Sequence, residues 1–144
     1  MSRWEVALVR AALAWLVVTG ALGVVATISP ALGGLLRPTH THVGTVGFLV
    51  SLVMGVAYWM MPRPGGIRQE RLEAVTFWLL HGGLALRVVA EPAWRVTLAA
   101  GWSTALLASA LAQLAAMRVF AWAMRARVVT ADEVKRRRAR ATTA

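Results

Sequence analysis

The sequence predicts an all-α integral membrane protein, a bundle of four transmembrane helices with both termini in the cytoplasm. The chain of 144 residues is 58% hydrophobic, and its mean hydropathy of +0.61 exceeds the level of a soluble globule. Its apolar residues gather in four runs, each close to the ~20 residues that cross a bilayer. Basic residues stand between and beyond these runs, so their distribution predicts the orientation. The length suits a single domain.

Composition also excludes several classes of site. The chain has no cysteine, which excludes disulfides, thiolate metal sites and covalent haem attachment. A net charge of +10 would suggest nucleic acid in a soluble protein. Here the basic residues interrupt apolar runs, so we expect lipid contact and no nucleic-acid partner. No Ser-His-Asp set, phosphate loop or intramembrane carboxylate pair points to an enzyme activity.

The first two spans are bounded by proline-containing segments. The first span runs from Trp4 to Ile28 and ends at Ser29-Pro30, and residues 31–39 are expected to form a short connection. The second span covers Thr39 to Met61, with Pro62 and the residues after it as a firm stop.

The last two spans complete a transmembrane domain of residues 1–128. The third is expected from Ala74 to Ala90, closed by Glu91-Pro92, and the fourth from Val96 to Met117 with helix continuing to about Arg127. A basic cytoplasmic tail, residues 129–144, follows; it has a capping-box pattern at 130–133 and a basic run at 135–138 that suits anionic lipid head groups.

The basic residues are distributed unequally between the two sides. With the N-terminus inside, the outer side keeps only Arg37, Arg87 and Arg95. The inner side holds the others, Arg3, Arg10, Arg63, Arg68, Arg71 and the eight basic residues from Arg118 onward. This asymmetry predicts a multi-pass protein of the bacterial inner (plasma) membrane with His40 and His42 at the outer end of the second span.

Two histidines open the second span. At ~100° per residue, one helix face carries His40, Gly44, Gly47, Ser51 and Gly55. An imidazole above small residues suits a flat, axially ligated macrocycle such as haem, with Gly44 and Gly47 lining the groove. The same small residues would equally let another helix pack closely. His42 points ~200° away, so a copper or zinc site built from His40 and His42, a weaker possibility, would need an unwound helix start.

The third span carries His81 and Arg87. From helix rise, His81 lies ~10 Å and His40 ~30 Å above the inner boundary, so they match poorly as ligands of one iron. His81 is either a hydrogen-bonding histidine beside Gly82-Gly83 or part of a cofactor site. Arg87 could reach the outer head groups, or meet haem propionates together with Arg37 and Arg95.

The second span also carries a recognisable set of motifs. They are Arg37-Pro38-Thr39-His40-Thr41-His42, Gly47-Phe48, Met54-Gly55-Val56-Ala57-Tyr58 and Pro62. This segment resembles the second transmembrane helix of haem–copper oxidase catalytic subunits, above all the C-type oxidases and the related nitric oxide reductase large subunit. Short stand-alone proteins labelled subunit I-like share it, with a third span opening like Phe77-Trp78-Leu79. The likeness covers residues 35 to 92.

The resemblance implies one haem-ligand position. In that family an Arg-x-x-His stretch at the outer end of this helix carries an axial ligand of the low-spin haem, and His40 matches it. His42 falls where the family has a non-ligand. The family's catalytic subunits have about twelve spans, and the remaining haem and copper ligands lie on helices that this chain lacks. Oxygen or nitric oxide reduction therefore does not carry over.

Two hypotheses follow for function. The first is a haem b protein for electron transfer or gas (NO/O2) sensing, with iron ligated by His40 and a homodimer bringing equivalent histidines to one level. A redox protein partner would then exchange electrons with it. The second is a structural or assembly subunit of a respiratory oxidase complex, without a cofactor.

Overall fold

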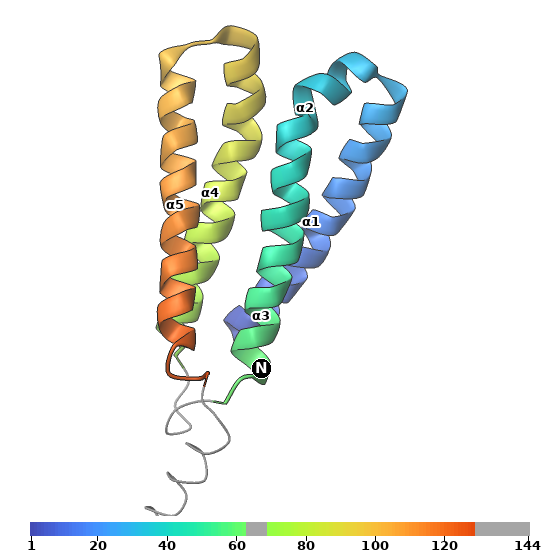
Figure 1. Ribbon diagram of the computed structural model, residues 1–144. Helices are drawn as coiled ribbons and strands as arrows, with labels where there is room; N and C mark the ends of the chain where they lie inside the picture. The colour runs from blue at the N-terminus through green and yellow to red at the C-terminus, as the bar shows by residue number, and fades with distance from the viewer. Residues whose placement is uncertain (63–68, 129–144) are drawn as a thin grey trace, which may run out of the picture.

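The computed structural model describes residues 1–62 and 69–128, which form helices and short connections (Figure 1). Four helical spans are long and apolar enough to cross a membrane. They are α1 (Arg3–Ile28), the continuous series α2 (Pro30–His42), η1 (Val43–Val50) and α3 (Ser51–Met60), then α4 (Glu70–Thr97) and α5 (Ala100–Met124). The predicted all-helical architecture with four spans is confirmed. The predicted basic tail, with its capping box, lies outside the described residues.

A capping box begins α1. The Ser2 side chain accepts a hydrogen bond from the backbone N–H of Glu5 at 3.1 Å, and the Glu5 carboxylate accepts one from the backbone N–H of Ser2 at 2.6 Å. Two of the amides that a helix start leaves unpaired are thereby satisfied. The helix then follows the predicted first span almost residue for residue, from Arg3 to Ile28.

The connection expected over residues 31–39 is wrong, because α2 begins at Pro30. Ser29 alone joins the helices: it ends α1, and its side chain accepts from the N–H of Leu32 at 3.5 Å to cap α2. Proline suits a first helical position, where its missing N–H has no partner to lose. Pro38 lies inside α2 and cannot bond the carbonyl of Gly34. Arg95 donates to that carbonyl instead, at 3.2 Å.

The predicted end of the third span at Glu91-Pro92 is also wrong. Helix α4 continues through Pro92 to Thr97 and ends at Leu98, whose φ of 54° is left-handed. Glu91 is buried against α2, where its carboxylate accepts a hydrogen bond from Thr39 at 3.0 Å. This tertiary contact holds the segment inside the bundle, and such packing allows a proline to remain within a membrane helix.

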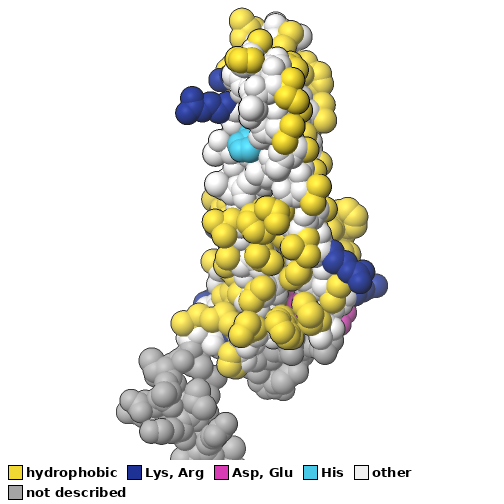
Figure 2. All heavy atoms as spheres, turned by 90° about the vertical axis from the view of Figure 1, so that its right-hand side faces the viewer, with side chains coloured by type: hydrophobic (Ala, Val, Ile, Leu, Met, Phe, Trp, Pro, Cys, Tyr) yellow, Lys and Arg dark blue, Asp and Glu magenta, His cyan; other side chains and the backbone are white. Residues whose placement is uncertain are grey.

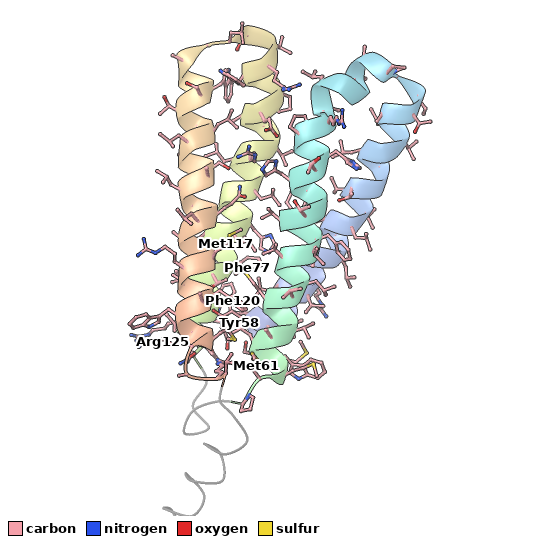
Figure 3. The ribbon with its side chains drawn as sticks, viewed as in Figure 1. Tyr58, Met61, Phe77, Met117, Phe120 and Arg125 are labelled. Atoms are coloured by element: carbon pink, nitrogen blue, oxygen red, sulfur yellow. The ribbon has the colours of Figure 1, made fainter. Side chains whose placement is uncertain are left out.

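The helices pair as two hairpins, α1 with α2–η1–α3 and α4 with α5 (Figure 1). Helix α4 packs most extensively on α5, and it also contacts α1, α2 and η1 of the first hairpin. Figure 3 shows Tyr58, Phe77, Met117 and Phe120 in the half of the bundle nearer the N-terminus. There the Tyr58 and Phe120 rings meet edge to face, with centroids 5.3 Å apart. We call this half the N-terminal end of the bundle and the other the opposite end.

Candidate functional site

The predicted small-residue face exists, and α1 covers it. A Cβ added at Gly47 would lie 2.9 Å from Cγ of Trp15, and one at Gly44 would lie 3.2 Å from Cγ2 of Thr19. A Cβ at Gly55 would lie 2.9 Å from Cγ2 of Val9. The glycines therefore let α1 approach closely along this face, as in a small-residue helix seam. Gly44 and Gly47 line a helix contact within the chain.

His40 lies beyond this seam, at the opposite end of the bundle. Its ring packs towards Gly23 of α1, where an added Cβ would lie 3.7 Å from Cε1. The ring and Arg37 line a pocket of about 260 Å³ between α1 and α2, together with Leu22, Gly23, Ala26, Pro30, Gly33 and Leu36. The face of the molecule drawn in Figure 2 shows a histidine at the surface near a basic side chain.

The Nδ1 atom of His40 is buried, and it bonds to no group in the part of the chain that the structure describes. Buried polar atoms are nearly always hydrogen-bonded, so an exception calls for an explanation. Because Nδ1 is closed off from the pocket, a ligand there would be bound through Nε2, and the unpaired Nδ1 can hold the ring proton that leaves the Nε2 lone pair free.

His42 is bonded differently. Its Nδ1 lies 3.0 Å from the carbonyl oxygen of Pro38. Since a carbonyl only accepts, Nδ1 carries the proton and Nε2 keeps its lone pair. Helix α2 runs without interruption through His40 and His42, so their side chains diverge by ~200°. The pair is not arranged to chelate one metal ion.

His81 lies deeper in the bundle and uses both ring nitrogens. Trp15 donates its indole hydrogen to Nδ1 at 3.1 Å, which places the remaining ring proton on Nε2. Nε2 therefore donates to Oγ of Ser51 at 3.2 Å, and Ser51 donates to the carbonyl of Leu8 at 3.1 Å. His81 thus ties α4 to α1 and α3, with no lone pair left for a metal.

The structure separates His40 from His81. His40 packs beside Gly23 and His81 beside Trp15, positions eight residues apart on α1. At ~1.5 Å per residue this is ~12 Å along the helix. One iron cannot join these two imidazoles within a single chain, in agreement with the depths expected from the sequence.

Arg87 has an internal partner. Its Nη2 lies 3.2 Å from Oε1 of Glu91, and Oε2 of Glu91 accepts the Thr39 hydroxyl. The ion pair lies within α4, and the hydrogen bond from Thr39, the residue before His40, joins Glu91 to α2. The Nε atom of Arg87 is buried and without a partner among the described residues. Of the three arginines considered for an anion, Arg37 is the one that lines the His40 pocket. Its side chain is exposed.

Sequence reasoning missed several buried polar residues. Glu5 and Glu73 were given no role and Glu91 was taken to close the third span, yet all three are buried. Ser2 donates to Glu73, and Arg127, also buried, donates to the carbonyl of Tyr58 at 2.9 Å. The i, i+4 spacing of Arg87 and Glu91 could have indicated their ion pair. These groups hold helices together and lie outside the His40 pocket.

Within residues 1–62 and 69–128, no three His, Cys, Asp or Glu side chains gather as a metal site. Comparison of the chain with protein-family models, curated proteins and solved structures found no match. The candidate site therefore consists of one imidazole, one arginine and an apolar pocket between two helices.

Proposed function

We propose that this chain is a haem b-binding membrane protein with His40 as an axial ligand, serving electron transfer or gas (NO/O2) sensing. The observation that carries the proposal is the His40 ring on the wall of the α1–α2 pocket, with its buried Nδ1 unpaired among the described residues. Of the three histidines, His81 is saturated by internal bonds, and His42, which keeps a lone pair on Nε2, does not line this pocket. Neutral imidazole is a standard ligand of haem iron.

The residues around His40 fit the edge of a macrocycle. Leu22 and Leu36 give the pocket apolar walls, and Arg37 supplies a positive charge for a propionate. Gly33 packs against Ala26, where an added Cβ would lie 3.0 Å from the Ala26 backbone, so this pair forms a helix contact. The pocket of about 260 Å³ is below the ~300–1,000 Å³ of most ligand pockets. One chain therefore covers part of the haem, and a surface outside this chain must cover the rest of it. When bound, haem would supply one-electron chemistry and a site for a diatomic gas.

A homodimer is our proposal for that second surface. A two-fold axis along the membrane normal would bring two His40 side chains to the same depth. We further propose that both termini are cytoplasmic and that the protein spans a bacterial plasma membrane. The unequal distribution of basic residues supports this orientation, which places the His40 pocket at the outer side.

A cofactor-free structural or assembly subunit of a respiratory oxidase complex is the second candidate. The glycine seam favours it, because contact with α1 explains Gly44, Gly47 and Gly55 without any cofactor. Copper bound through His40 and His42 is a weaker candidate, since the two rings diverge on a regular helix. Metal analysis separates it from haem.

The test is haem content per protein in three variants, expressed with haem supplied in excess. We expect His40→Ala to lose at least nine-tenths of the haem, and His42→Ala, the control on the same helical turn, to keep most of it. His81→Ala should also keep haem wherever the variant remains folded by circular dichroism. Full haem content in His40→Ala, or its loss in His42→Ala alone, would refute the assignment.

A further inference from the structure

The face of α5 that points away from the bundle carries an ordered stripe of side chains. Ser109, Gln113 and Ala116 are buried on the opposite face of this helix. The outward stripe, at ~100° per residue, consists of Leu107, Leu111, Leu114, Arg118, Trp122 and Arg125. Its four large apolar side chains are each 53–60% exposed, so no other part of the described chain covers them.

A shallow groove of about 300 Å³ lies on this stripe, and it is lined by Leu111, Leu114, Ala115, Arg118 and Val119. Further towards the N-terminal end, the guanidinium carbon of Arg125 lies 3.2 Å from the centroid of the Trp122 ring. Figure 3 shows Arg125 on the outer side of α5, directed away from the other helices. The groove therefore continues into a flat aromatic and basic surface.

The two arginines lack protein counter-charges. Neither Arg118 nor Arg125 forms an ion pair within residues 1–62 and 69–128. Arg118 lies seven residues inside Arg125, about 10 Å deeper along the helix. Arg118 follows directly on the fourth apolar run, at the boundary of the hydrocarbon, where an anionic head group can meet it.

The side chains along the stripe change from apolar to basic, as a phospholipid changes from its acyl chain to its phosphate. From Leu107 to Arg118 is eleven residues, or ~16 Å of helix, close to half of the ~30 Å hydrocarbon core. An acyl chain can lie over the three leucines while a phosphate meets Arg118. Trp122 and Arg125 then lie at head-group level, where tryptophan and arginine are favoured.

We propose that this α5 groove binds one phospholipid with an anionic head group, held by Arg118 and Arg125. A second copy of the chain is a poorer occupant. A two-fold contact on the same stripe would bring Arg118 of each copy together, and like charges repel strongly where water is scarce. The site is independent of His40, which lies at the opposite end of the bundle between other helices.

Native mass spectrometry of the full-length protein tests this site, with phosphatidylglycerol and phosphatidylcholine added in equal amounts. We expect the wild type to retain one phosphatidylglycerol per chain in preference to phosphatidylcholine. Arg118→Gln and Arg125→Gln should each weaken that retention roughly fivefold, the effect of one basic residue near anionic lipid. Arg10→Gln is the matched control: Arg10 is exposed on α1, seven residues from Arg3, and loses the same charge.

Two outcomes would overturn the proposal. If Arg10→Gln reduces lipid retention as much as Arg118→Gln does, the attraction is general and no α5 site exists. If the wild type carries no preferred lipid but forms dimers that Leu111→Ala disrupts, the stripe is a protein interface. Circular dichroism on each variant checks that the helices are intact.

Discussion

Trp15 donates its indole hydrogen to Nδ1 of His81, and this bond determines which ring nitrogen carries the histidine proton. With Nδ1 occupied, the ring proton lies on Nε2 and points at Ser51. His81 therefore cannot remove a proton from Ser51, and it cannot bind iron without losing at least the hydrogen bond from Trp15. This half-buried histidine beside a serine is a structural link between three helices.

Trp15→Phe tests this role. The variant leaves Nδ1 of His81 without its donor, so we expect the free energy of unfolding to fall by about 1 kcal/mol, typical of a hydrogen bond between membrane helices. Unfolding by denaturing detergent measures it. Trp59→Phe is the control, because Trp59 is 49% exposed and should change stability by less than ~0.5 kcal/mol.

Haem content in the same variant separates the two histidines. If His40 is the ligand, Trp15→Phe keeps its haem while losing stability. Loss of haem from a folded His81→Ala variant, with haem kept by His40→Ala, would instead place the cofactor at His81 and contradict the role assigned here.

At the scale of the element, the seam between α1 and the η1–α3 segment determines how closely the first hairpin packs. Gly47 is its tightest point, since an added Cβ would meet Cδ2 of Leu84 at 2.8 Å as well as Trp15. Three helices meet there, so none of the contacting groups can move away freely. The seam therefore fixes the position of α4 as well as that of α1.

We expect Gly47→Ala to lower the free energy of unfolding by about 1–3 kcal/mol, the usual cost of overpacking. Gly82→Ala is the matched control: it lies in α4 with nothing within 4 Å of the added Cβ. Alanine is the better helix former, so this variant should gain up to ~1 kcal/mol. Equal effects in the two variants, measured by the same detergent unfolding, would mean that the seam is not close-packed.

The same segment shows how far sequence can predict this fold. Gly44, Gly47, Ser51 and Gly55 all face α1 and so share one face, as the periodicity predicted, although Val43–Val50 forms a π-helix and not the α-helix whose ~100° per residue was assumed. Periodicity could not tell whether a haem or a helix covers the face, since both need small residues. Only the position of α1 decides that question, and it depends on contacts between segments far apart in sequence.

Proline predicted helix ends correctly at Pro30 and Pro62 but not at Pro38 and Pro92. Pro38 and Pro92 were taken to mark boundaries, yet both lie inside helices. Arg95 satisfies the carbonyl that Pro38 leaves unpaired, and Glu91 holds the helix beside Pro92 against Thr39. Local rules miss such partners because each comes from another helix. At the candidate site, Arg37 and His40 were foreseen, whereas the contribution of α1 to the pocket was not.

At the scale of the whole molecule, the N-terminus and the last turn of α5 lie at the same end of the bundle (Figure 1). Of the basic residues within 1–62 and 69–128, only Arg37, Arg87 and Arg95 belong to the opposite end. Positive residues are retained on the cytoplasmic side, so the proposed orientation puts the His40 pocket outside and the α5 groove inside.

Cysteine labelling tests the orientation. The chain has no cysteine of its own, so each variant carries a single reactive thiol. A membrane-impermeant maleimide should label Ala99→Cys, in the exposed connection between α4 and α5, in intact cells. Thr142→Cys should react only after the membrane is opened. The reverse pattern would place the termini outside and the His40 pocket on the cytoplasmic side.

The most direct test of the central claim is the absorption spectrum of the purified protein, expressed with haem in excess. The account predicts a Soret band and, on reduction, the sharp bands of a haem b with imidazole ligation, all absent from His40→Ala. A folded wild-type protein without colour would contradict it and leave the chain as a structural membrane subunit.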